Sequence, residues 1–344
     1  MTGRKINLKP LAPDWDGMLR NLKRNETPDR VYFLEFGIAE NIIDRFAVRY
    51  GLCDVNCTDM KIKRIKVHSF LGHELFRISF DGCTFPIPAY PENTAQSEQC
   101  HISDWADFEK FDWPDPAKAD FSVLEFHEGN IPPGMKVFHV LHIWEKVRDL
   151  LGYERFCVKL FEDPQLIEAV FDKVGSYSLK IVEAVCQFDC YGAVFLADDL
   201  GFKTSTMISP DDIRRYVIPW QRKAAEIAHG RNKFFFLHSC GQMYDLMPDY
   251  VNTVRIDAKH SFEDVILPIA EAKKKYGKDI ALIGGLDVDF LCRSSEDSIR
   301  RKVREVIDAC LPGGRFFFGS GNWVTEYVPF ENYAAALEEA RRSV

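Results

Sequence analysis

Two periodicities of apolar residues alternate along the C-terminal two thirds of the chain. Short runs rich in β-branched and aromatic residues predict strands, and longer stretches with apolar residues three or four positions apart predict helices. The predicted strands cover residues 135–140, 193–197, 233–238, 253–256, 280–284 and 315–319. The predicted helices begin at Pro164 and Pro210, behind the N-cap residues Asp163 and Ser209, and also cover 262–276, 296–310 and 330–342.

Strands that alternate with helices are typical of a parallel sheet whose faces are covered by helices. An open doubly wound sheet and a closed (β/α)8 TIM barrel both fit this order, and the number of strand–helix units favours the α/β barrel, with residues 30–36 as its first strand. The surplus over the ~250 residues of a typical barrel falls at about residues 50–130, where 64–70 and 74–80 predict antiparallel strands. We therefore expect a single domain, 1–344, with an N-terminal α+β insertion that covers one barrel end.

The composition of the chain argues against some classes of partner and some cellular locations. The net charge of −8 argues against nucleic acid, because phosphate binding depends on clustered Lys and Arg. The sequence shows neither a run of about 18 apolar residues, which a membrane span needs, nor a secretory h-region. Ten cysteines without framework spacing are typical of the reducing cytoplasm. Cys53 and Cys57, near Cys83 and Cys100, are interpreted as unpaired thiols in preference to a second metal site. The oligomeric state stays open.

Polar side chains follow several of the predicted strands directly. Active sites of barrel enzymes are built at these C-terminal strand ends, so we expect the side chains to converge on one site. The residues concerned are Asp198, Asp199, His238, Cys240, His260, Asp287, Ser320 and Asn322, together with Glu35 late in the first predicted strand.

His238 and Cys240 are the strongest candidates for a metal site. Side chains two residues apart on a strand point the same way, and imidazole and thiolate are preferred zinc ligands. A catalytic zinc ion needs three protein ligands, and only two are supplied locally. The spacing alone therefore favours the alternative, in which His238 bonds a carboxylate and Cys240 packs as a small apolar group.

The other polar residues also have structural explanations. Asp198 and Asp199 could cap the following segment or pair with Lys203, and Asp287 could cap the next helix. His260 could be a loop residue without a role. Glu35 could be a site acid or could pair with a surface base.

Five segments resemble the uroporphyrinogen decarboxylase-like superfamily, which includes the zinc-dependent methylcobamide:thiol methyltransferases. They follow one another in the order of the family: WEKVRDLLGYERFCVKLFEDPQLIEAVFDKV (144–174), ADDLGFKTSTMISPDDIRRYVIPWQRK (197–223), FFFLHSCGQMYDLMPDY (234–250), DIALIGGLDVDFL (279–291) and GGRFFFGSGNWVTEYVPFENYAAAL (313–337). The resemblance implies the (β/α)8 fold and an enzyme.

Within this superfamily the H-x-C motif marks the methyltransferase branch, which binds zinc through this motif and a later cysteine. His238 and Cys240 match the motif, but Ser320 stands where the later cysteine is expected. Either Glu35 or Asp199 could complete the zinc site, or metal binding has been lost. The decarboxylases fit worse, because their arginine-rich loop, their aspartate turn and their last-strand histidine have no counterparts in this sequence.

The resemblance therefore implies a corrinoid-dependent methyltransferase. A zinc ion at His238 and Cys240 would activate a thiol, and a corrinoid on a partner protein would supply the methyl group, with Asp199 and Asp287 as orienting groups. The alternative is a metal-free lyase of the decarboxylase type that acts on a tetrapyrrole or small carboxylate. A second alternative is a barrel that binds a corrinoid or tetrapyrrole without turnover. The catalytic candidates are Asp198, Asp199, His260 and Asp287, and the substrate-binding candidates are Glu35, Ser320 and Asn322.

Overall fold

The fold is that of a computed structural model that describes residues 6–23, 26–54, 57–79, 85–89 and 100–342. The chain divides into two compact units. The terminal unit consists of Met1–Arg77, Gly129–Val137 and Asp257–Val344, and the central unit of Ile78–Glu128 and Phe138–Ile256.

The strands follow one another in the sheet in chain order. They are β1 (Leu75–Arg77), β2 (Lys136–Leu141), β3 (Tyr191–Ala197), β4 (Phe234–His238), β5 (Ala258–His260), β6 (Ala281–Leu286) and β7 (Phe316–Ser320). Within the central unit β3 pairs with β4 in parallel, and within the terminal unit β5, β6 and β7 pair in parallel. These strands are almost entirely buried, as expected for a parallel sheet covered by helices. The predicted α/β class with parallel strands is confirmed.

The predicted first strand, 30–36, is not a full strand. It forms a single parallel bridge from Phe33 to Phe318 of β7, in which the Leu34 amide donates to the Phe318 carbonyl (3.1 Å) and the Phe318 amide to the Tyr32 carbonyl (2.8 Å). The described residues thus contain seven strands, and this first segment contributes only isolated bridges, Phe33 to Phe318 and Ile38 to Val324. The barrel prediction requires eight strands.

Helices occupy most of the remaining described chain. In the terminal unit they are α1 (Trp15–Lys23), α2 (Glu40–Arg49), α3 (Met60–Leu71), α12 (Ile269–Tyr276), α13 (Val288–Arg293), α14 (Glu296–Cys310) and α15 (Phe330–Arg342). From residue 105 to 256 they are α4 (Trp105–Lys110), η2 (Pro116–Lys118), α5 (Ser122–Asn130), α6 (Trp144–Leu151), α7 (Tyr153–Glu162), α8 (Pro164–Val185), α9 (Pro210–Asp212), η3 (Ile213–Val217), α10 (Ile218–Gly230), η4 (Tyr244–Leu246), α11 (Met247–Asp249) and η5 (Tyr250–Val254).

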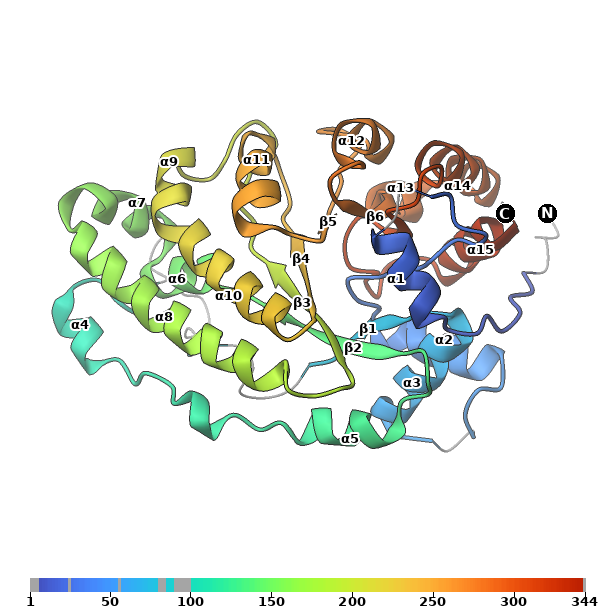
Figure 1. The fold of residues 1–344 in the computed structure, drawn as a ribbon, viewed down its shortest axis with the longest axis horizontal. Coiled ribbons are helices and arrows are strands. Elements are labelled where there is room, and N and C mark those ends of the chain that lie inside the picture. The colour runs from blue at the N-terminus through green and yellow to red at the C-terminus, as the bar shows by residue number, and fades with distance from the viewer. Residues whose placement is uncertain (1–5, 24–25, 55–56, 80–84, 90–99, 343–344) are drawn as a thin grey trace. The chain divides into compact units, whose positions relative to one another are not determined.

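Helix α8 shows how the pattern produces the core of the central unit. Asp163 caps it by accepting a hydrogen bond from the Leu166 amide, and Pro164 occupies its first position. The apolar residues that recur along α8 at helical spacing are buried. Helix α10 packs along α8 and also contacts β3 and β4 (Figure 1), and it thereby covers the strands that carry the site described below.

Two predicted elements are wrong, and a third is shorter than predicted. Residues 64–70 belong to helix α3, since Asp59 caps its first turn and Gly72 ends it in the left-handed conformation. Residues 253–256 are not a strand, because η5 is a π-helical turn that ends at Arg255 (φ 64°), and the strand follows at β5. The predicted helix 262–276 begins only at Ile269, behind Pro268.

The predicted strand 74–80 is present in shortened form as β1, while residue 80 lies outside the described residues. It is not antiparallel to its neighbour β2. The Lys136 amide donates to the Glu74 carbonyl (2.7 Å) and the Ile78 amide to the Phe138 carbonyl (2.9 Å), so both strands run in the same direction.

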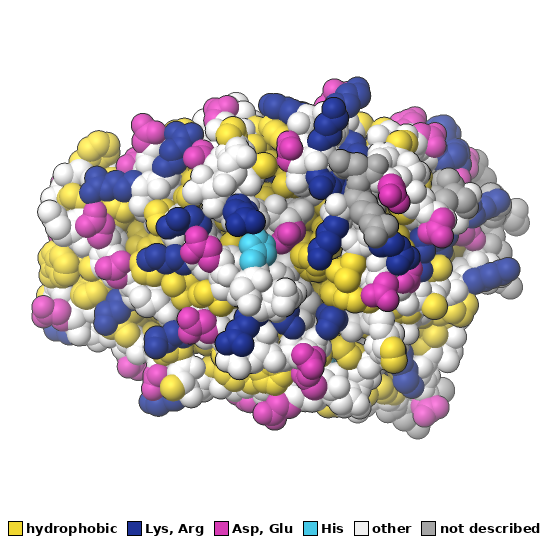
Figure 2. Space-filling view, in the orientation of Figure 1, with side chains coloured by type: hydrophobic (Ala, Val, Ile, Leu, Met, Phe, Trp, Pro, Cys, Tyr) yellow, Lys and Arg dark blue, Asp and Glu magenta, His cyan; other side chains and the backbone are white. Residues whose placement is uncertain are grey.

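No described helix is both long and apolar enough to cross a membrane. On the face drawn in Figure 2, Lys and Arg side chains are interspersed with Asp and Glu and do not form a large basic patch. Cys53, Cys57 and Cys100 are free thiols, and Cys83 lies outside the described residues. Among the described residues, Cys53 and Cys57 do not belong to a cluster of three potential metal ligands.

Candidate metal centre

The C-terminal ends of β3 and β4 bring the predicted metal ligands together. Ala197 of β3 lies opposite His238 of β4, and the Asp198 amide continues the ladder by donating to the His238 carbonyl (3.1 Å). Asp199 leaves β3 at the level at which Cys240 leaves β4. The parallel register therefore places the carboxylate next to the H-x-C motif, as expected for groups at the carboxyl ends of adjacent strands.

Two glycines let the loops behind these strands approach closely. Gly241 has φ 78°, and a Cβ atom at this position would overlap the Gly201 carbonyl oxygen. The Gln242 amide donates to the Phe202 carbonyl (2.6 Å), and the Leu200 amide donates to the buried Ser239 hydroxyl (3.1 Å). Backbone contacts therefore fix the two loops on either side of Asp199 and Cys240.

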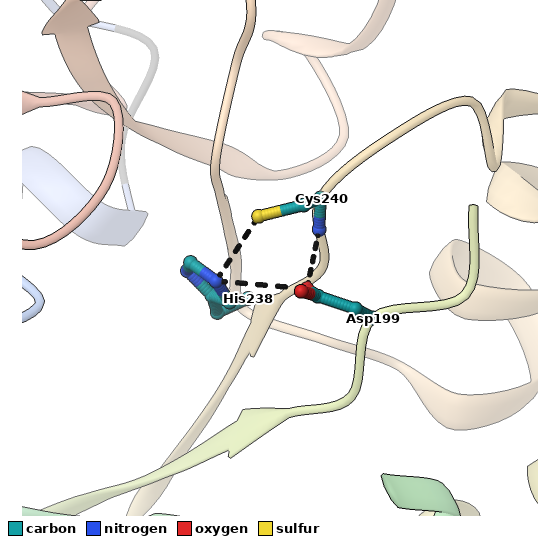
Figure 3. Close-up of side chains that lie close together, drawn as sticks. All are labelled: Asp199, His238 and Cys240. Atoms are coloured by element: carbon teal, nitrogen blue, oxygen red, sulfur yellow. Dashed lines mark hydrogen bonds and ion pairs between the residues drawn. The ribbon is translucent and has the colours of Figure 1, made fainter. Parts of the chain in front are cut away.

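Asp199, His238 and Cys240 form a compact triad (Figure 3). One potential ligand atom from each residue lies within 4.8 Å of the other two. The His238 Nε2 atom is 3.5 Å from Cys240 Sγ and 3.8 Å from Asp199 Oδ1, and the Cys240 amide donates to Asp199 Oδ1 (2.8 Å). Imidazole nitrogen, thiol sulfur and carboxylate oxygen are all zinc ligands, so this set of side chains fits a zinc ion.

The triad is only partly accessible. The His238 side chain is 6% exposed, whereas 38% of the Asp199 side chain is exposed. Burial raises the pKa of Asp199, and the hydrogen bond from the Cys240 amide opposes this shift. Asp199 and Cys240 are therefore partly exposed, whereas His238 is buried.

Residues that were not predicted from the sequence hold Asp199 in place. Glu145 Oε1 accepts a hydrogen bond from the Asp199 amide (3.3 Å), and the Trp144 indole donates to the Asp199 carbonyl (3.0 Å). His142 Nδ1 lies 2.9 Å from Glu145 Oε2. Burial raises the pKa of Glu145, but His142 and Arg148 outweigh it and hold this pKa below its usual value. The sequence did contain one indication of their role. His142 and Glu145 are polar residues that directly follow the buried strand β2, as the other candidates follow their strands.

Asp198, a predicted catalytic residue, is an anchor for helix α6. Its fully buried carboxylate accepts hydrogen bonds from the backbone amides of Ile143, Trp144 and Glu145 and from the Gln221 side chain. Burial and the nearby Glu145 raise its pKa to about 6. The structure thus matches the alternative in which this acid caps a segment, although the capped helix precedes it in the chain.

A second polar cluster lies in the terminal unit. Glu35 accepts hydrogen bonds from the Ser320 hydroxyl (2.5 Å), the Ser320 amide (3.0 Å) and the Tyr333 hydroxyl (3.2 Å). These hydrogen bonds lower the pKa of Glu35, but burial has the larger effect and raises it to about 7. The His260 Nε2 donates to the Ser320 carbonyl (3.0 Å), and burial lowers the His260 pKa to about 3, so the ring is neutral. Of the two carboxylates expected to complete the metal site, Glu35 is bound by Ser320 and Tyr333, and Asp199 lies in the triad.

The two remaining candidates have local roles. Asp287 caps α13 by accepting hydrogen bonds from the Asp289 (2.8 Å) and Phe290 (3.3 Å) amides. The Asn322 side-chain oxygen accepts a hydrogen bond from the Trp323 amide (2.8 Å).

The sequence is similar to that of uroporphyrinogen decarboxylases. The family model described as Uroporphyrinogen decarboxylase (URO-D) matches residues 146–343, which is more than half of the chain. Proteins named uroporphyrinogen decarboxylase are similar in sequence, from Syntrophotalea carbinolica (25% identity, 53% of this chain and 50% of the relative) and Streptomyces coelicolor (26% identity, 49% and 46%). The chain spans about half the length of these curated relatives.

Among solved structures, a methyltransferase from Methanosarcina mazei is similar with a TM-score of 0.70. The two chains are 17% identical, and the match covers 96% of this chain and 99% of the other, so the likeness is one of fold. The family model, which matches more than half of the chain, shows that the chain belongs to the uroporphyrinogen decarboxylase (URO-D) family.

Proposed function

We propose that this protein is a methyltransferase that moves a methyl group from a methylcobamide to a zinc-activated thiol. The observation that carries the proposal is the triad of Asp199, His238 and Cys240, whose ligand atoms lie within 4.8 Å of one another. We further propose that Asp199 takes the place of the later cysteine that the methyltransferase branch uses. We also propose that the fold is a closed (β/α)8 barrel and that the protein acts in the cytoplasm.

His238 Nε2, Cys240 Sγ and a carboxylate oxygen of Asp199 would hold the ion, and three protein ligands leave one position open for substrate. Bound zinc would lower the pKa of a substrate thiol, so that the nucleophilic thiolate persists at neutral pH. The chain's own contribution is to keep the ligands in place. Glu145 and Trp144 restrain the Asp199 backbone, and the Cys240 amide orients its carboxylate.

The methyl donor in this proposal is a corrinoid carried by a separate protein, and the acceptor is a small thiol. Asp287 would support the loop that follows β6. The donor, the acceptor and the partner are those that the resemblance to the methyltransferase branch implies. In this proposal the thiolate would attack the methyl carbon, and the corrinoid would leave as the methyl–cobalt bond breaks.

The first test is metal content by mass spectrometry on purified protein. Wild type is expected to hold about one zinc ion per chain. Cys240→Ser should lose it, and Asp199→Asn should weaken zinc binding by about tenfold or more. Cys292→Ser, which removes a half-buried thiol of α13 outside the triad, is the matched control and should keep the metal. Zinc-free wild type that takes up no added zinc would overturn the proposal.

The second test is turnover. Wild type supplied with methylcobalamin and a small thiol should produce the thioether, and Cys240→Ser should not. If Cys240→Ser retained full methyl transfer, the triad would not be the catalytic centre.

The curated relatives favour a second candidate, because both are named uroporphyrinogen decarboxylase. This metal-free lyase would use Asp198, Asp199 and His260 on a tetrapyrrole or small carboxylate. Asp198 is fully engaged with helix α6, and His260 is buried and neutral, so Asp199 is the most available group. Carboxylate loss from a tetrapyrrole by metal-free protein would support this candidate. Corrinoid binding without metal or turnover would instead support a non-catalytic barrel.

A further inference from the structure

Arg77 ends β1 in the terminal unit, and its guanidinium lies against two aromatic rings. Its Cζ atom is 4.4 Å from the centre of the Trp323 ring and 5.3 Å from the centre of the Phe36 ring. Trp323 follows β7, and Phe36 follows the segment that bridges to β7. Two cation–π contacts therefore hold the positive group where these segments end.

The two rings are fixed before any ligand arrives. A Cβ atom at Gly37 would lie 2.7 Å from the Trp323 ring, so the ring packs directly on the backbone there. The Val324 amide donates to the Gly37 carbonyl (2.9 Å), which ties Trp323 to this segment. Phe36 meets Trp323 edge to face at 6.4 Å and stacks on His260 at 5.6 Å. The aromatic surface is thus rigid.

Among the described residues, no carboxylate pairs with Arg77. Its Nε atom is buried and has no hydrogen-bond partner in the described part of the chain, and the like-charged Arg64 is the described charged group that influences its pKa. Arg64 itself pairs with Glu40 at 2.8 Å. Burial and the charge of Arg64 lower the pKa of Arg77 to about 10, which leaves it protonated at neutral pH.

Other arginines of the terminal unit with little exposure have oxygen acceptors. Arg300 contacts three glutamates at 2.7 to 3.0 Å, and Arg30 pairs with the buried Glu74 at 3.1 Å. Arg341, which lacks an acidic partner among the described residues, donates to the backbone carbonyls of Leu71 (3.0 Å) and Lys9 (2.5 Å). The guanidinium of Arg77 instead contacts the aromatic rings of Phe36 and Trp323. A ring face attracts the charge, but it does not provide oxygen acceptors for the in-plane N–H donors of a guanidinium.

We propose that Arg77, Phe36 and Trp323 form a binding site for a singly charged oxyanion, the carboxylate or sulfonate of a small organic ligand. Such a group matches the guanidinium fork with two parallel hydrogen bonds, and the rings accommodate the apolar body that carries it. A single charge is sufficient, since Arg64 is already paired. The site contains none of the triad residues, so it is independent of the proposed metal chemistry.

The test uses benzoate, benzenesulfonate and inorganic phosphate as probes at constant ionic strength, with binding followed by titration calorimetry. Wild type should bind benzoate or benzenesulfonate saturably and more tightly than phosphate. Arg77→Met keeps the apolar stem and removes the fork, so it should bind about tenfold or more weakly. Arg64→Met, which removes a neighbouring cation already paired with Glu40, is the control and should bind as wild type does.

Equal affinity in wild type and Arg77→Met, or no saturable binding by wild type, would overturn the proposal. If Arg77→Met does not fold, phenylglyoxal modification of wild type replaces it. Benzoate should then protect Arg77 and leave the modification of Arg64 unchanged, and equal modification of Arg77 with and without benzoate would contradict the site. The zinc content of Arg77→Met should equal that of wild type, which separates this result from the fate of the metal centre.

Discussion

Glu35 and Asp199 show how environment assigns different properties to the same functional group. Both are carboxylates near strand ends, and both were expected as possible zinc ligands. Glu35 is buried and receives hydrogen bonds from Ser320 and Tyr333, whereas Asp199 keeps an accessible oxygen beside His238 and Cys240. The difference arises from residues far away in the chain, and for this reason the local sequence could not decide between them.

The raised pKa of Glu35 predicts a pH-dependent stability. The folded pKa of about 7 exceeds the reference value of 4.5, so the folded state binds the proton more tightly. The stabilisation is fully present below the reference pKa and is lost as pH rises through about 7, and it amounts to up to about 3 kcal/mol. In Glu35→Gln this loss should be absent. Denaturant unfolding of both proteins between pH 4.5 and 8 measures the difference.

Glu305→Gln, an exposed substitution on α14, serves as the control for this experiment and should unfold with the pH dependence of wild type. A Glu35→Gln variant whose stability falls with pH as steeply as that of wild type would show that Glu35 does not carry the effect.

At the residue scale, the sequence was most informative where chemistry depends on neighbours in the chain. His238 and Cys240 face the same way because they are two residues apart, and the structure brings both into the triad. Glu145 and Trp144 escaped notice because their contact with Asp199 spans more than fifty residues. Their place behind a strand was visible, but their partner was not.

At the scale of elements, boundaries were predictable where caps and periodicity agree. Helix α14 begins directly behind its N-cap Ser295, and its predicted range matches the observed one. Residues 64–70 failed because polar and apolar residues alternate there over a short distance and imitate a strand. The capping bonds of Asp59 and the left-handed Gly72 lie outside that window and favour the helix.

The anchor of α6 leads to a stability prediction. Asp198→Asn places an amide that donates hydrogen bonds against donors from the backbone and from Gln221, so it should destabilise the fold by roughly 2–4 kcal/mol. Ser295→Ala, which removes the exposed cap of α14, should cost only about 1 kcal/mol. Denaturant unfolding compares the two, and equal costs would argue against the structural role of Asp198.

The paired loops behind β3 and β4 lead to a second prediction at this scale. Gly241→Ala places a side chain at φ 78° and against the Gly201 carbonyl, so the loops must separate. We expect a loss of at least about 2 kcal/mol of stability together with weaker zinc binding, because Cys240 is adjacent. Gly129→Ala in α5, where a methyl group meets open space, is the matched control. A Gly241→Ala protein with wild-type stability and metal content would contradict this account.

At the scale of the whole molecule, the alternation of strands and helices was sufficient for the α/β class and the parallel pairing. It did not predict that the chain forms two compact units, because each unit is assembled from segments that are distant in the sequence. The single bridge at Phe33 shows the same limit. Pairing between the first and last parts of a sheet depends on its curvature, which a local pattern does not contain.

Net charge is also a property of the whole molecule, and here it predicts that the protein does not bind nucleic acid. With a net charge of −8 and mixed charges on the face in Figure 2, the protein should not bind duplex DNA at about 0.15 M salt. Fluorescence anisotropy of a labelled random-sequence duplex measures this directly. Tight binding that weakens steeply with added salt would reveal a basic surface elsewhere.

The contact between Gly201 and Gly241 also has an evolutionary consequence. Because the loop backbones touch at Gly201 and Gly241 and are joined by the bond from Gln242 to Phe202, much of the loop geometry does not depend on the side chains of the triad. If the triad holds the proposed zinc ion, a lineage can exchange one ligand for another while the scaffold persists, and selection on the two glycines should be stricter than selection on the triad. In a set of related sequences, the residues at positions 199, 238 and 240 should vary among members that retain both glycines. The pair of glycines should therefore identify relatives more reliably than the triad does.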